Sequence, residues 1–288
     1  MKPVAARAMI VGSALGAAGL MAACAVSAEA TPRQTATAAV EEAKGYVAEA
    51  RLFALADAAP PPPAEGSVQD IDDRARSDAY RALAGGDRWL LATAHAEVRP
   101  ELARQHFDCA LGVRFQGQST PRLTAILART LHDADEAAER IKARAHRPRP
   151  VAADPDRTPC QRVTPAGRLT ASYPSGSATV GAAYGEVMAA LDPAHAAQAR
   201  EIGRQIAVSR AVCGMHYDTD VREGIALGRA VAAEIVASPA FAADLTAAQA
   251  ELAVVRTTGL TNAGCTAEAA ALALPLPLPL ALPEPAAP

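Results

Sequence analysis

The sequence has no run of alternating β-branched and polar residues, no surplus of basic charge and, beyond its first residues, no apolar run long enough to cross a membrane. Half-buried strands show such alternation, so its absence argues against a β-sheet protein. A formal net charge of -3 at pH 7 leaves no basic surface for nucleic acid. A membrane-spanning helix needs roughly 20 apolar residues. We therefore expect no nucleic-acid partner and no stable membrane insertion.

The sequence does contain apolar residues at helical spacing. Of its 288 residues 50% are hydrophobic, enough for one sizeable core, and alanine, a strong helix former, is the commonest residue. We predict an all-α fold in which prolines interrupt the helices at 59–66 and residues 151–171 form a loop. Helical patterns cover residues 38–58, 69–84, 88–96, 100–110, 121–145, from 180 onward, 194–213 and from 220 to 236.

The first residues have the organisation of a secretory signal. Lys2 and Arg7 precede an apolar stretch at residues 8–23, and small residues follow at 26–30. This pattern predicts a signal peptide over residues 1–28, and cleavage after residue 30 is the alternative. The mature protein would then be periplasmic or secreted. A membrane anchor is the alternative, but the apolar stretch is short for one. Cys24 allows a second alternative, a lipoprotein.

The predicted mature chain divides into a catalytic domain at residues 31–265 and a tail at 266–288. The tail is rich in Ala, Leu and Pro, with repeated Leu-Pro pairs, and is predicted to be disordered and to stay outside the core.

Four cysteines remain after signal cleavage, an even number in a protein sent to an oxidising compartment. Two disulfides are therefore expected from Cys109, Cys160, Cys213 and Cys265. Of the three possible pairings we favour Cys109 with Cys160 and Cys213 with Cys265. Buried free thiols are the alternative, above all for Cys213, which sits inside a helical pattern.

One short block carries two cations at a fixed spacing. Lys142 is separated by six residues from Arg149-Pro150. Seven positions are about two helical turns, so both side chains can point the same way from the end of one helix and reach one anion. The alternative is a solvated basic face, since Arg140, Arg144, His146 and Arg147 are neighbours.

Two further blocks follow. Ser175, Gly176 and Ser177 come just before a helical pattern, where free backbone N–H groups and the helix dipole can hold an anion. An ordinary helix start capped by Ser177 is the alternative. Further on, Ser209-Arg210 is followed by five residues and His216, and then by three residues and Asp220. Asp220 can also be simply the cap of the next helix.

These three blocks, in this order, resemble the class A bacterial nonspecific acid phosphatases, relatives of the type-2 phosphatidic acid phosphatases and the vanadium haloperoxidases. The family pattern is Lys, six residues, Arg-Pro; Pro-Ser-Gly-His; and Ser-Arg, five residues, His, three residues, Asp. Both outer blocks fit, whereas Ser177 stands where the family has histidine. The likeness covers roughly residues 52–252, including the segments 60–63, 107–111 and 212–214.

The resemblance implies a helical bundle of the phosphatidic acid phosphatase and haloperoxidase kind, acting as a metal-independent acid phosphatase without a cofactor. It implies small phosphate monoesters as substrates and a homo-oligomer. Phosphate would be bound by Lys142, Arg149, Ser175, Gly176 and Arg210.

The resemblance also implies roles for three catalytic residues. His216 would attack phosphorus and form a phosphohistidine, while Asp220 would hold the other ring nitrogen. The family histidine that Ser177 replaces protonates the departing alcohol. A serine hydroxyl is a poor proton donor, so alkyl esters should react more slowly than activated aryl esters. His146 or a carboxyl group from the 151–171 loop could replace the missing acid.

Two other functions remain open from the sequence. A degenerate member of the family would bind phosphate or phosphorylated ligands without useful turnover. Haloperoxidase chemistry would instead use vanadate held by the same cations and His216, because one fold can carry several activities.

Overall fold

The computed structural model describes residues 44–277. The predicted signal peptide, the alternative at Cys24, residues 38–43 and residues 278–288 lie outside this range. Within it the fold is all-α, as predicted, and contains no strand.

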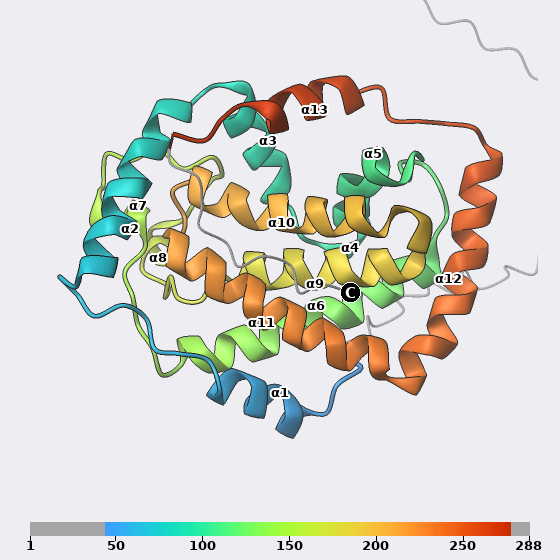
Figure 1. Cartoon of the computed structure of the whole chain (residues 1–288), viewed down its shortest axis with the longest axis horizontal. Helices are drawn as coiled ribbons and strands as arrows, with labels where there is room; N and C mark the ends of the chain where they lie inside the picture. Colours follow the sequence, from blue (N-terminus) through green and yellow to red (C-terminus); the bar gives the residue numbers. More distant parts are fainter. Residues whose placement is uncertain (1–43, 278–288) are drawn as a thin grey trace, which may run out of the picture. The chain divides into compact units, whose positions relative to one another are not determined.

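Four helices build the centre of the fold. Helix α9 (Gly176–Leu191) lies between α10 (Ala196–Val212) and α11 (Asp218–Ala237), and α6 (Pro121–Lys142) packs against α9 and α11 (Figure 1). Their inward faces bury Leu127, Tyr184 and Ile206, each at most 1% exposed. The core is thus a bundle whose middle helix is covered on both sides.

Glycine lets α9 and α10 approach closely. A Cβ at Gly203 would lie 2.6 Å from the carbonyl oxygen of Gly181 and 2.8 Å from the Cα of Gly185. Real Cβ atoms do not approach backbone so closely, so the absence of a side chain sets the distance between the two helices. This contact fixes the end of α10 relative to the start of α9, where the site lies.

Shorter elements surround the four central helices. They are α1 (Glu49–Asp57), α2 (Val68–Ala79), η1 (Tyr80–Leu83), α3 (Asp87–His95), α4 (Pro100–Ala103), η2 (Arg104–Phe107), α5 (Asp108–Leu111), α7 (Pro150–Ala153), α8 (Pro165–Arg168), η3 (Pro193–His195), α12 (Pro239–Thr257) and α13 (Cys265–Ala273).

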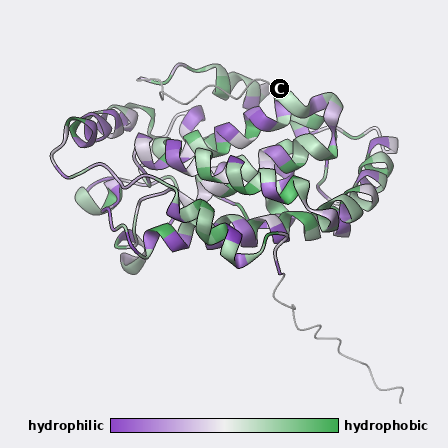
Figure 2. Ribbon diagram, turned by 60° about the horizontal axis from the view of Figure 1, so that its bottom comes forward, coloured by the Kyte–Doolittle hydropathy of each residue, from purple (hydrophilic) through white to green (hydrophobic). Residues whose placement is uncertain are grey.

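Helix α2 docks through polar rather than apolar side chains. Its buried residues are Asp70, Asp73 and Ser77, whereas Val68 and Ile71 are 87% and 59% exposed. Figure 2 shows this helix, at the left, as mostly hydrophilic. Because α2 offers no apolar face to the core, its position depends on the partners of its aspartates.

Several elements differ from the sequence prediction. Helix α1 begins at Glu49, because Asp133 accepts hydrogen bonds from the backbone N–H groups of Tyr46 (2.7 Å) and Val47 (3.2 Å) and holds these residues in a bend outside the helix. Helix α12 was not predicted, although Pro239 at its first position is a helix-start signal. The 151–171 loop contains two single-turn helices, α7 and α8.

The disulfide pairing favoured from the sequence is wrong. The structure pairs Cys109 with Cys265 and Cys160 with Cys213, so Cys213 is not a free thiol. The cause is the fold: the start of α13 returns to α5, and the loop after α7 reaches the end of α10. Sequence distance gave no indication of either contact.

The region predicted as a disordered tail is helical over most of its described part. Helix α13 begins at Cys265, whose Cα lies 5.4 Å from that of Cys109. Nearby, the side-chain amide of Asn262 donates a hydrogen bond of 3.0 Å to the Asp108 carboxylate. These contacts hold the segment, and Ala271 is buried at 4% exposure.

In the part of the chain that the structure describes, no single helix has both the length and the apolar character to cross a membrane. Taken together α11 and α12 meet both criteria, but the chain bends by 85° between them.

Candidate active site

The ends of the central helices that carry the three sequence blocks meet at one end of the bundle, on the left in Figure 1. There they enclose a cavity of about 390 Å³. The predicted site residues that line it are Lys142, Arg149, Gly176, Ser177, Arg210 and His216, whereas Ser175 and Asp220 stand behind its wall.

His216 lies at the buried floor of the cavity and is 3% exposed. Its Nδ1 lies 2.8 Å from the backbone oxygen of Ser172, and its Nε2 lies 2.9 Å from Nη1 of Arg149. A carbonyl can only accept and a guanidinium can only donate, so these partners assign the proton to Nδ1 and the lone pair to Nε2. Burial, and next the positive charge of Arg149, hold the pKa of His216 well below its usual value. The ring is therefore neutral, with its unprotonated nitrogen in the cavity.

Asp220 does not bond to the His216 ring as the sequence analysis expected. The Ser172 carbonyl occupies that nitrogen, and the Asp220 carboxylate accepts instead from the Ser172 hydroxyl (2.6 Å) and the Tyr217 backbone N–H (2.9 Å). The carboxylate thus fixes the two segments that flank the imidazole. Burial raises the pKa of Asp220, and the nearby Arg147 charge opposes that effect.

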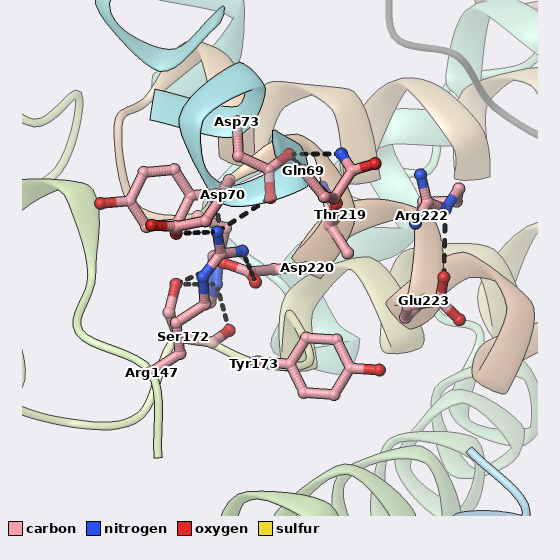
Figure 3. A network of polar contacts seen from close by, with 12 residues as sticks. Gln69, Asp70, Asp73, Arg147, Ser172, Tyr173, Thr219, Asp220, Arg222 and Glu223 are labelled. Atoms are coloured by element: carbon pink, nitrogen blue, oxygen red, sulfur yellow. Dashed lines mark hydrogen bonds and ion pairs between the residues drawn. The ribbon is translucent and has the colours of Figure 1, made fainter. Parts of the chain in front are cut away.

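Arg147 joins this carboxylate to helix α2, a link that Figure 3 shows from close by. Its guanidinium lies 2.8 Å from Asp220, 2.8 Å from Asp70 and 2.9 Å from Asp73. Asp73 also accepts from the hydroxyl of Thr219 on α11 at 3.0 Å. Arg147 is 5% exposed and belongs to the buried network, not to the solvated basic face proposed as an alternative.

Arg149 and Arg210 are buried cations without an acidic partner. They are 8% and 2% exposed, and among residues 44–277 neither forms an ion pair with a carboxylate. Arg149 donates to Thr170 and to the backbone oxygen of Met215, and Arg210 donates to the side chain of Gln161 at 2.7 Å. Burial lowers both pKa values, that of Arg210 to about 10. Buried charges are normally paired, so this pair fits an anionic ligand.

Lys142 and Arg149 reach the same cavity, but not from one helix as predicted. Helix α6 ends at Lys142, and Arg149 caps the separate turn α7. Lys142 also pairs with Glu139 at 2.5 Å. The proline-bearing segment between the two cations is not helical. The two side chains therefore meet because this segment returns to the cavity, and not because they share one face of a helix.

The Ser-Gly-Ser block forms the start of α9. Ser175, rather than Ser177, is the cap: its hydroxyl accepts from the backbone N–H of Ala178 at 3.2 Å. Gly176 and Ser177 are the first helical residues, and their N–H groups have no acceptor among the described residues. A Cβ at Gly176 would lie 3.1 Å from Nζ of Lys142. The free N–H groups and this cation therefore face the same space, which suits an anion.

The cavity wall includes residues that the sequence analysis did not single out. Gln161 is held next to Arg210 by the neighbouring disulfide between Cys160 and Cys213. Asp135 is the only acidic side chain among the described residues that line the cavity. It lies seven positions before Lys142 on α6, the helical spacing that could have drawn attention to it. No group of three His, Cys, Asp or Glu side chains suited to a metal ion occurs in residues 44–277.

Comparison with known proteins places the site in context. No family model matches the chain. It is 31% identical over 202 residues to the acid phosphatase of Zymomonas mobilis, an alignment that covers 70% of this chain and 76% of the relative. Non-specific acid phosphatases of Providencia stuartii and Salmonella typhimurium are 26% and 27% identical and are covered over 80% and 77% of their lengths.

An all-α fold whose buried cations surround a neutral histidine is a suitable scaffold for a phosphatase. At this identity and coverage, the chain belongs to the acid phosphatase family. It is a phosphatase enzyme.

Proposed function

We propose that the protein hydrolyses small phosphate monoesters to an alcohol and inorganic phosphate, without a metal ion, through a phosphohistidine at His216. One observation carries the proposal: two buried guanidinium groups, without carboxylate partners in the described part of the chain, line the same cavity as a neutral imidazole whose Nε2 carries the lone pair. Cations positioned in this way can stabilise the charge on the equatorial oxygens during phosphoryl transfer.

A bound substrate phosphate would supply acceptors and negative charge to the cations and N–H groups of the cavity that lack them. The phosphate takes the place between Arg149, Arg210 and Lys142, with the N–H groups of Gly176 and Ser177 on one side. Nε of Arg210 is buried without a partner among the described residues, and a phosphate oxygen would satisfy it. Arg149 would turn its Nη1 from Nε2 of His216 to the phosphate, which frees the lone pair for attack.

In the first chemical step, the lone pair of His216 Nε2 forms a bond to phosphorus, and the bond from phosphorus to the ester oxygen breaks. The departing oxygen takes that electron pair and a proton. The Nδ1 proton stays on the ring and remains bonded to the Ser172 carbonyl, which stabilises the charged phosphohistidine. In the second step, water attacks phosphorus, the P–N bond breaks and the imidazole returns to its neutral form.

The pKa of His216 fits activity in acid. An ordinary histidine becomes protonated below pH ~6.5 and then cannot attack. Because burial holds the pKa of His216 well below that value, its nucleophilic form persists as the pH falls. The rate should therefore be maintained below pH ~6.5 and decline only as the lowered pKa is reached.

The direct test is hydrolysis of 4-nitrophenyl phosphate against pH with EDTA present, comparing the mature protein with His216→Ala. We expect EDTA-resistant turnover in the acid range that the variant lacks. Brief incubation with a substrate radiolabelled in its phosphate group, followed by denaturation in alkali, should leave label on the mature protein but not on His216→Ala. Equal inactivity of both proteins would refute the proposal and leave phosphate-ligand binding as the alternative.

We also propose that the protein is exported. Two disulfides in the described part of the chain suit an oxidising compartment, and the first residues have the pattern of a cleavable signal. Cell fractionation with N-terminal sequencing of the mature protein tests this.

A further inference from the structure

The proposed reaction requires a proton for the departing oxygen, and the obvious donors are absent from the cavity. Ser177 lines the wall, but a hydroxyl is a poor acid. His146 is exposed and does not line the cavity, nor do the loop carboxylates Asp154 and Asp156. The candidates considered from the sequence are therefore not in position.

Asp135 is in position. It lies on the same side of α6 as Lys142, and its Oδ1 is 3.9 Å from where a side chain on Gly176 would begin. It is solvent-exposed at the mouth of the cavity, whereas His216 is buried at the floor. A phosphate between them would have the nucleophile on one side and Asp135 on the other, as in-line displacement requires.

We propose that Asp135 is the general acid that protonates the leaving oxygen, in place of the imidazole that Ser177 does not supply. This inference rests on the proposed function. As the phosphorus–oxygen bond breaks, the ester oxygen takes the bonding electron pair and the carboxyl proton of Asp135. The resulting carboxylate then removes a proton from the water that attacks phosphohistidine, which restores the acid.

Two features of the Asp135 carboxyl suit that role. It forms no hydrogen bond or ion pair with any residue in the described range, so its proton is available to a ligand. Partial desolvation on the side that borders the cavity wall, with the charges of Glu139 and Glu136 adding to it, raises the pKa of Asp135, while Lys142 opposes the shift. In mild acid a larger fraction of this carboxyl is protonated than of an ordinary one.

The test separates acid catalysis from binding by varying the leaving group. In Asp135→Asn, kcat/KM for an alkyl ester such as glycerol phosphate should fall about 10²- to 10⁴-fold, the usual contribution of a general acid. For 4-nitrophenyl phosphate, whose leaving group needs little protonation, the loss should stay below about tenfold. Asp156→Asn is the matched control: it makes the same chemical change at an exposed carboxylate that does not line the cavity and should leave both rates within about twofold.

A double variant tests whether a new proton donor can replace Asp135. Adding Ser177→His to Asp135→Asn should restore alkyl-ester hydrolysis, because an imidazole then stands in the cavity wall. Equal losses for both esters, an unchanged alkyl rate in Asp135→Asn, or a wild-type protein active on the aryl ester alone would overturn the role of Asp135. Failure of the proposed function differs, because it would abolish aryl hydrolysis in the wild type as well.

Discussion

Among single residues, Arg147 shows how far the candidate site depends on a side chain that does not line the cavity. It holds Asp220, which bonds to the hydroxyl of Ser172 and the N–H of Tyr217, and these segments flank His216. The same guanidinium forms ion pairs with two aspartates of α2. One cation thus bridges three buried carboxylates, so it holds the segments that flank His216 and also stabilises the fold.

Replacing Arg147 by methionine should be strongly destabilising, because it leaves buried carboxylates without a counter-charge. We expect a loss of about 3–5 kcal/mol in the free energy of unfolding, measured by urea denaturation. Arg200→Met is the control, since Arg200 pairs with Glu186 on the surface and is 49% exposed. Such pairs contribute about 0–1 kcal/mol. Similar losses in both variants would contradict the role assigned to the network.

The sequence located the cavity residues better than it explained them. Fixed spacing brought Lys142, Arg149, Arg210 and His216 into consideration, and all four line one cavity. It could not show that the Ser172 backbone would take the ring nitrogen assigned to Asp220, because backbone acceptors carry no sequence signal.

At the scale of elements, glycine residues set the distance between helices α9 and α10. Gly203 on α10 faces the backbone of α9 across a gap too small for a methyl group. The two helices carry Arg210 and Ser177, so the same contact sets the width of the cavity between these residues.

Gly203→Ala should therefore destabilise the protein, although alanine is the better helix former. Overpacking against backbone costs about 1–3 kcal/mol in the free energy of unfolding, which urea denaturation measures. Gln198→Ala, at an exposed position of the same helix, is the control and should change it by less than about 0.5 kcal/mol. A Gly203→Ala protein more stable than the wild type would mean that propensity outweighs the contact.

Element prediction succeeded where apolar spacing was regular and failed where tertiary contacts decide. Patterns over 121–145 and 194–213 match α6 and α10 closely. The start of α1 depends instead on Asp133, far along the chain, and α13 on the bonds of Cys265 and Asn262. Local sequence does not encode such partners.

At the scale of the whole molecule, the two disulfides have separable effects. The bond between Cys109 and Cys265 joins α5 to α13, and neither cysteine lines the cavity. The bond between Cys160 and Cys213 holds Gln161 against Arg210. One crosslink therefore acts on stability, and the other acts on stability and on the site.

Removing Cys109 and Cys265 together, as alanines, should lower the free energy of unfolding by about 2–5 kcal/mol and leave kcat/KM of the folded protein unchanged. Removing Cys160 and Cys213 should also lower kcat/KM by about tenfold or more, because Arg210 loses a charged hydrogen bond. Urea titrations and 4-nitrophenyl phosphate kinetics on both variants provide the comparison. Identical kinetics would show that the second crosslink does not support the site.

The Cys109–Cys265 bond also closes a covalent ring that contains every predicted site residue from Lys142 to Asp220, since all of them lie between its ends in the sequence. A protease that cuts once at the exposed Pro155 or Asp156 would leave both fragments tethered. Nicked molecules would run as a single band without reductant and as two bands with it. In a compartment rich in proteases, the enzyme could therefore be cleaved without coming apart.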